Sequence, residues 1–122
     1  MLAHARTAAP DECCGMLIGI GERIDEAVPA RNVADRPSVH FLIDPHDHLA
    51  AIRDARRRSL DVVGFYHSHP GTPATPSATD VAEASYPDLV TVIVSLGTEP
   101  PDLRLFRVGR GNFHPIAFVT VA

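Results

Sequence analysis

The chain has 122 residues, of which 45% are hydrophobic and 21% charged, ordinary proportions for one globular domain with its own core. Its formal net charge of −4 gives no electrostatic support to nucleic-acid binding. There is no apolar run of the roughly 18 residues that would span a membrane, and residues 1–9 lack the apolar segment of a secretory signal. The adjacent Cys13 and Cys14 do not indicate a disulfide scaffold. We therefore expect one cytoplasmic domain over residues 1–122, without nucleic-acid or membrane partners.

The first half of the chain predicts the end of a helix, three strands and a second helix. An apolar run flanked by glycine predicts a buried strand, and the stretch after Gly21 is its candidate partner. Asp44 followed by Pro45 is typical of a helix start, because aspartate caps free N–H groups and proline suits the first helical position. In chain order we expect a helix end at 1–8, strands at 14–20 and 23–28, a polar loop at 32–37, a strand at 39–43 and a helix from 45 to about 58.

The second half predicts a strand, a stiff loop, a short helix and three further strands. An apolar strand leads directly into His67-Ser68-His69-Pro70, and two prolines stiffen the loop that follows. The expected elements are a strand at 61–66, a loop at 71–76, a helix from Ser77 that ends before Pro87, and strands at 89–96, 103–108 and 113–121. Because helices and strands intermix without strict alternation, we expect a three-layer α/β sandwich with a curved, mixed sheet.

Two histidines, His67 and His69, stand at the end of a predicted strand. Side chains at positions i and i+2 of a strand point to the same face, so these two imidazoles can share one metal ion. In isolation, such a pair is more often two exposed histidines at a strand end. His46 and His48 form a second pair of this spacing, but on a helix such side chains diverge, and we expect them to be surface residues.

Ser77 and Asp80 open the predicted short helix. Taken alone, this spacing is typical of a capping box, in which the two side chains satisfy free backbone N–H groups. Taken with the histidine pair, Asp80 adds a carboxylate to two imidazole nitrogens. Catalytic zinc sites use three such protein ligands and leave a fourth position for water. The proline-stiffened loop between the two segments lowers the entropy lost when the site forms.

A fourth candidate, Glu12, lies in the segment Pro10-Asp-Glu-Cys-Cys-Gly15, just before the first buried strand. An acidic residue at such a position is usually a solvated strand end. If this strand lies beside the strand that ends at His67, however, Glu12 would face a water molecule bound at the metal.

Together these segments resemble a known motif. Pro-x-Glu-x-Cys-Gly, followed some fifty residues later by His-x-His-Pro-x6-Ser-x-x-Asp, is similar to the JAMM motif of the MPN+ metallopeptidases. The resemblance implies a cytidine-deaminase-like α/β sandwich with one zinc ion per chain, held by His67, His69 and Asp80. It also implies that Glu12 is the general base and that Ser77 donates to the oxyanion. The implied reaction is peptide or isopeptide hydrolysis near the C-terminus of a ubiquitin-like protein.

Three functional classes can be compared on these residues. Small bacterial members of the family include enzymes that release cysteine from the C-terminus of a ubiquitin-like sulfur-carrier protein, and the shortness of the chain favours that class. A non-catalytic MPN-type scaffold is the alternative, but such subunits lose the metal ligands that this chain retains. A nucleobase deaminase would need His-x-Glu and Pro-Cys-x-x-Cys, and the sequence has neither. The identity of the carrier and the formation of a homodimer are left open.

Overall fold

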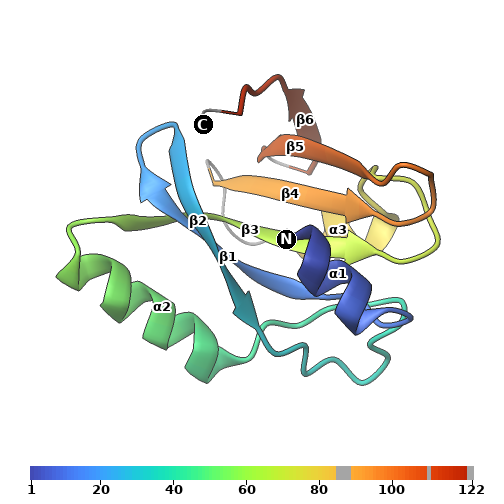
Figure 1. Cartoon of the computed structure of the whole chain (residues 1–122), viewed down its shortest axis with the longest axis horizontal. Helices are drawn as coiled ribbons and strands as arrows, with labels where there is room; N and C mark the ends of the chain where they lie inside the picture. The colour runs from blue at the N-terminus through green and yellow to red at the C-terminus, as the bar shows by residue number, and fades with distance from the viewer. Residues whose placement is uncertain (85–88, 110, 121–122) are drawn as a thin grey trace.

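A computed structural model of the protein describes residues 1–84, 89–109 and 111–120. Its centre is one six-stranded sheet with the strand order β2-β1-β3-β4-β5-β6 (Figure 1). Strands β3 and β4 run parallel, and the other neighbouring pairs run antiparallel, so the predicted mixed sheet is confirmed. The strands are β1 (Cys14–Ile20), β2 (Arg23–Ala30), β3 (Asp61–His69), β4 (Val90–Ser95), β5 (Asp102–Val108) and β6 (Phe113–Ile116).

Helices cover both faces of this sheet, which confirms the predicted three-layer α/β sandwich. Helix α1 (Leu2–Ala8) packs on one face, and helix α2 (Pro45–Arg57) packs on the other, against β1, β2 and β3 (Figure 1). As predicted, Asp44 caps α2, because its carboxylate accepts the His46 backbone N–H at 2.7 Å. The short helix α3 (Ala78–Ala82) follows the loop after β3. Among the described residues, no helix is long and apolar enough to cross a bilayer.

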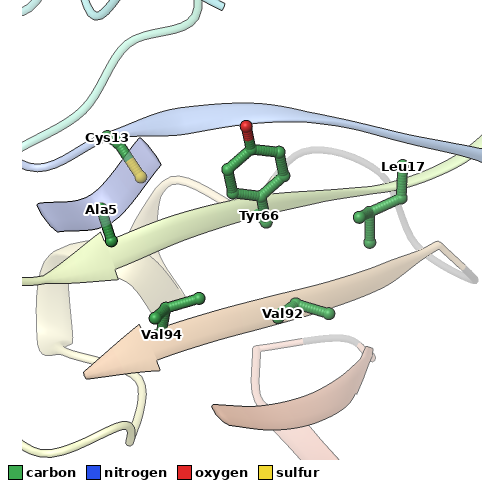
Figure 2. Close-up of a cluster of buried hydrophobic side chains, with 6 residues drawn as sticks. All are labelled: Ala5, Cys13, Leu17, Tyr66, Val92 and Val94. Atoms are coloured by element: carbon green, nitrogen blue, oxygen red, sulfur yellow. The ribbon is translucent and has the colours of Figure 1, made fainter. Parts of the chain in front are cut away.

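The core on the α1 face is built around Tyr66. Its fully buried ring lies among small and branched side chains from α1, β1 and β4 (Figure 2). The Tyr66 hydroxyl is 2.8 Å from His4 Nδ1, a hydrogen bond that attaches α1 to the sheet. Across the β1–β3 ladder Tyr66 is paired with Gly15, where a Cβ atom would lie 2.3 Å from the tyrosine ring. Glycine at this position is therefore required by the close approach of the ring.

The core on the α2 face contains the alternate side chains of β1. Cys14, Met16 and Ile18 pack there against Ala51 and Ala55 of α2. Both cysteines are free, and burial raises the pKa of the Cys14 thiol to about 12. Cys14 therefore serves as a small buried core residue.

The segment between β2 and α2 differs from the prediction. Residues 39–43 do not form a strand; only an isolated bridge joins Asn32 and Ile43. The Asn32 side chain takes the place of a ladder, because its amide oxygen accepts the N–H groups of Ala34 and Leu42 and its amide nitrogen donates to the carbonyl of His40. Local side-chain hydrogen bonds of this kind compete with sheet pairing. We call residues 31–44 the Asn32 loop.

The ends of three further elements differ from the prediction by three residues or more. Strand β3 continues to His69 instead of ending at residue 66, because its parallel pairing with β4 extends to Ser95. Helix α3 ends at Ala82, and residues 85 and 86 of the predicted helix lie outside the described part of the chain. The last strand ends at Ile116 instead of residue 121. The apolar residues after it did not indicate burial, since Val119 is 85% exposed.

Candidate metal centre

The site begins at the C-terminal end of β3. Pairing with β4 keeps this strand extended through His69, so His67 and His69 point to the same face of the sheet. Their Nε2 atoms lie 3.2 Å apart, and both side chains are buried. The predicted strand geometry of the pair is therefore present in the fold.

Helix α3 brings Asp80 to the two histidines. The Ser77 hydroxyl oxygen accepts the Asp80 backbone N–H at 3.0 Å, and Asp80 Oδ2 accepts the Ser77 backbone N–H at 2.9 Å. This is the predicted capping box. The same Oδ2 atom lies 3.2 Å from Nε2 of His67 and 3.1 Å from Nε2 of His69. The cap therefore also directs the carboxylate at the histidines.

The three ligand atoms suit a zinc ion. Each lies 3.1 to 3.2 Å from the other two. Zinc binds tetrahedrally with bonds of about 2.0–2.1 Å to histidine nitrogen or carboxylate oxygen, which places ligand atoms roughly 3.3 Å apart. Two imidazoles and one carboxylate also form a donor set that leaves the fourth position open. The residues present thus fit the metal that the motif implies.

The electrostatics of the three side chains favour a cation between them. Burial lowers the pKa of His67, which favours the neutral imidazole that binds metals. Burial also acts to lower the pKa of His69, but hydrogen bonds to Asp80 and to the Pro73 carbonyl outweigh it, and the net shift is upward. Burial acts to raise the pKa of Asp80, yet the hydrogen bonds from both histidines hold it well below its usual range. Asp80 is therefore ionised.

Strand pairing positions Glu12. Strand β1 runs antiparallel to β3 with Cys14 opposite His67, so the segment before β1 lies beside the histidines. The Cys13 backbone N–H donates to Ser68 Oγ at 2.8 Å, which ties this segment to the residue between the two histidines. The Asn32 amide donates to the Glu12 carbonyl at 3.0 Å. The backbone of Glu12 is thus held by two neighbouring segments.

The Glu12 side chain is suited to proton transfer. It is 7% exposed, and its Oε1 atom is buried without a hydrogen-bond partner in the described structure. Burial raises the pKa of Glu12 to about 7; the charge of His69 opposes this shift and that of Asp80 adds to it. A carboxyl group whose pKa lies near neutrality can both accept and return a proton at physiological pH.

Two contacts beside the site were not predicted from the sequence. The Phe41 ring stacks on the His67 ring, with centroids 4.3 Å apart and an interplanar angle of 18°. His40 Nε2 lies 2.6 Å from Oε2 of Glu83, which joins the Asn32 loop to the end of α3. The sequence held no signal for either contact, because the partners are separated by 26 and 43 positions and share no local pattern.

The structure thus brings His67, His69 and Asp80 together, with Glu12 just before the neighbouring strand β1 and Ser77 at the start of α3. Their roles as ligands, general base and oxyanion donor remain predictions. The second histidine pair lies on α2, as predicted. His46 is exposed, and His48 is half-buried, with its ring edge-on to Phe65 at a centroid distance of 5.3 Å.

Comparison with known proteins supports the resemblance stated from the motif. Residues 1–109 match the family described as prokaryotic homologs of the JAB domain. The chain is 40% identical over 101 residues to a desampylase of Haloferax volcanii, covering 78% of this chain and 73% of that protein. It is 38% identical over 116 residues to a CysO-cysteine peptidase of Mycobacterium tuberculosis, covering 91% and 77%.

A solved structure is also similar to this chain in fold and in sequence. The solution structure of a protein from Desulfitobacterium hafniense superposes with a TM-score of 0.87 at 35% identity, and covers 98% of this chain and 84% of that one. The family match spans most of the chain and includes every position of the motif. The chain therefore belongs to the prokaryotic JAB-domain family, as its motif predicted.

Proposed function

We propose that this protein is a zinc-dependent peptidase that hydrolyses an amide bond at or near the C-terminus of a ubiquitin-like sulfur-carrier protein or its conjugate. The observation that carries the proposal is the convergence of two histidine nitrogens and one carboxylate oxygen within 3.2 Å, beside the buried Glu12. The relative named for CysO-cysteine supports a carrier substrate with a C-terminal cysteine. The free, buried cysteines suit a reducing cytoplasm.

The reaction requires a nucleophile, a proton carrier and a group that stabilises the oxyanion. A bound zinc ion would supply Lewis-acid chemistry, polarising the carbonyl and lowering the pKa of water to about 7. Glu12 would accept a proton from the attacking water as the C–O bond forms. It would then transfer that proton to the leaving amine as the C–N bond breaks, so the carboxylate is regenerated in each turnover.

Ser77 is positioned to assist at the oxyanion. Its hydroxyl oxygen accepts the Asp80 N–H, which leaves the hydroxyl proton free to donate elsewhere. The residue is exposed, so a bound substrate can reach it. A hydrogen bond from Ser77 to the developing oxyanion would be stronger in the transition state than in the ground state, which is the requirement for catalysis.

The experiment that tests this proposal uses zinc-loaded protein and two sets of ubiquitin-like carriers from the same organism. One set carries a C-terminal cysteine, and the other carries a lysine isopeptide adduct. Intact masses are followed over time for the wild type and for Glu12→Gln, which preserves side-chain shape but cannot accept the proton. We expect the wild type to remove one adduct and the variant, at equal zinc content, to be slower by about 10²–10⁴-fold.

The same assay distinguishes the peptidase from the alternative, a non-catalytic scaffold. Protein that holds stoichiometric zinc but cleaves neither adduct would favour the scaffold and contradict the peptidase. A Glu12→Gln variant as active as the wild type would remove Glu12 from the mechanism while leaving the metal site in place.

A further inference from the structure

The two histidines differ in how their second ring nitrogen is held. A metal-binding histidine almost always donates its other N–H to an acceptor, which fixes the tautomer and the ring orientation. His69 follows this rule, since its Nδ1 lies 2.7 Å from the Pro73 carbonyl. His67 does not, because its Nδ1 is buried and has no hydrogen-bond partner in the described structure. When Nε2 binds a metal, something other than a hydrogen bond at Nδ1 must therefore orient the His67 ring.

Phe41 provides a contact of the required geometry. Its ring is nearly parallel to the imidazole of His67, with the centroids 4.3 Å apart. Rotation of the imidazole about its Cβ–Cγ bond would move Nε2 away from Asp80 and would also break this stacked contact. The stacked arrangement therefore opposes the same rotation that a second hydrogen bond would prevent.

Phe41 is itself held in place on both sides. The Asn32 side chain accepts the N–H of Leu42 at 3.0 Å and binds the carbonyl of His40 at 3.0 Å, so the backbone flanking Phe41 is fixed. The Phe41 side chain also packs against the apolar core on the α2 face, which includes Cys14 and Met16. These hydrogen bonds and this packing hold the Phe41 ring against His67.

We propose that Phe41 is a positioning residue that holds the His67 imidazole in its metal-binding orientation, in the place of a hydrogen bond to Nδ1. The inference rests on the zinc site of the proposed function and adds a residue from the Asn32 loop to it. It implies that zinc affinity depends on an aromatic ring at position 41 and not only on the three ligands.

The test measures the zinc dissociation constant by competition with a chromophoric chelator. The proteins are the wild type, Phe41→Leu, Phe41→Tyr and Phe113→Leu. Phe41→Leu keeps an apolar side chain but removes the stack, and Phe41→Tyr keeps the ring. Phe113→Leu is the matched control, because Phe113 is a half-buried phenylalanine on β6 that contacts Phe106.

We expect Phe41→Leu to bind zinc about 10–100-fold more weakly, the usual cost of losing a residue that orients a metal ligand. Phe41→Tyr and Phe113→Leu should remain close to the wild type. The visible spectrum of the cobalt-substituted protein gives a second measurement. Its d–d bands should shift in Phe41→Leu, because they report ligand geometry, and should not shift in Phe113→Leu. Far-UV circular dichroism verifies that each variant is folded.

The outcomes distinguish this inference from the proposed function. Equal zinc affinity in the wild type and Phe41→Leu would overturn the role of Phe41 alone. An equal loss in Phe113→Leu would also overturn it, because the effect would then come from general packing. A wild type that binds no zinc would refute both proposals. A wild type that binds zinc but cleaves no carrier would contradict only the peptidase, and the comparison of dissociation constants would still decide the role of Phe41.

Discussion

The burial of the Glu12 carboxyl group lowers the stability of the fold. This carboxyl group is buried and its Oε1 atom has no hydrogen-bond partner in the described structure, so the group resists ionisation; burial is the main cause of its raised pKa. The same burial suits the group to carry a proton between water and a leaving amine. Strained or poorly solvated groups of this kind are common at functional sites, where other parts of the fold offset their cost.

The raised pKa of Glu12 predicts a pH-dependent stability of the zinc-free protein. The folded-state pKa of about 7 exceeds the ordinary 4.5, so the folded state binds the proton more tightly and stability falls as pH rises between these values. Glu12→Gln removes this penalty. We expect the variant to match the wild type near pH 4 and to be more stable by about 3 kcal/mol at pH 8. Urea unfolding at both pH values measures the difference in unfolding free energy between the variant and the wild type. An equal difference at the two pH values would contradict the raised pKa of Glu12.

Ser77 combines its structural role as a helix cap with the chemical role that we propose for it. Ser77→Ala removes the cap of α3, which should lower the free energy of unfolding by about 0.5–2 kcal/mol. It also removes the proposed oxyanion donor, which should lower kcat by about 10²–10³-fold. Ser77→Thr retains the hydroxyl and should therefore recover much of the stability and much of kcat. Urea unfolding and carrier cleavage measure the two effects separately; full activity in folded Ser77→Ala would leave Ser77 as a cap only.

At the scale of elements, the pairing of β1 with β3 supports the core and the site together. The Tyr66 ring lies on one face of this pair, among the residues in Figure 2, and Gly15 leaves room for it. His67 is the next residue along β3 and points to the other face. The glycine of the motif thus has a packing role, whereas the role that we propose for Glu12 of the same motif is chemical. A single short segment serves both because adjacent strand residues face opposite layers.

Substitution of this glycine should test the packing role. In Gly15→Ala the new Cβ would meet both the Tyr66 ring and the Val28 carbonyl at under 2.5 Å, so the strands must shift. We expect the free energy of unfolding to fall by about 1–3 kcal/mol, the usual cost of overpacking. Gly71→Ala is the matched control, because nothing lies within 4 Å of a Cβ there. Thermal unfolding compares the two, and an equal effect would contradict the steric explanation.

For the molecule as a whole, the metal would join segments that come from different parts of the fold. The candidate ligands lie at the end of a central strand and at the start of α3, and the Asn32 loop lies against one of them through Phe41. A ligand that binds only the folded state stabilises it according to its concentration and affinity. Zinc should therefore stabilise the fold as well as take part in the reaction.

This predicts a concentration-dependent rise in the unfolding temperature. With zinc at about 100 times its dissociation constant, the gain is about 2.7 kcal/mol, or roughly 10 °C for a chain of this size. A chelator should reverse it. Asp80→Asn is the control, because asparagine can still accept the Ser77 N–H but lacks the charge that attracts the ion. An identical zinc response in Asp80→Asn would argue against this centre.

The sequence alone was sufficient for those parts of the site that depend on local geometry. The shared face of His67 and His69 follows from strand periodicity, and the link between Ser77 and Asp80 follows from helix capping, so spacing along the chain predicts both. The positions of Glu12 and Phe41 were decided by the tertiary structure. Glu12 reaches the histidines only because β1 pairs with β3 in one register, and Phe41 reaches His67 only because Asn32 folds its loop back on itself. Such contacts depend on how distant segments pack, and local sequence patterns do not encode that packing.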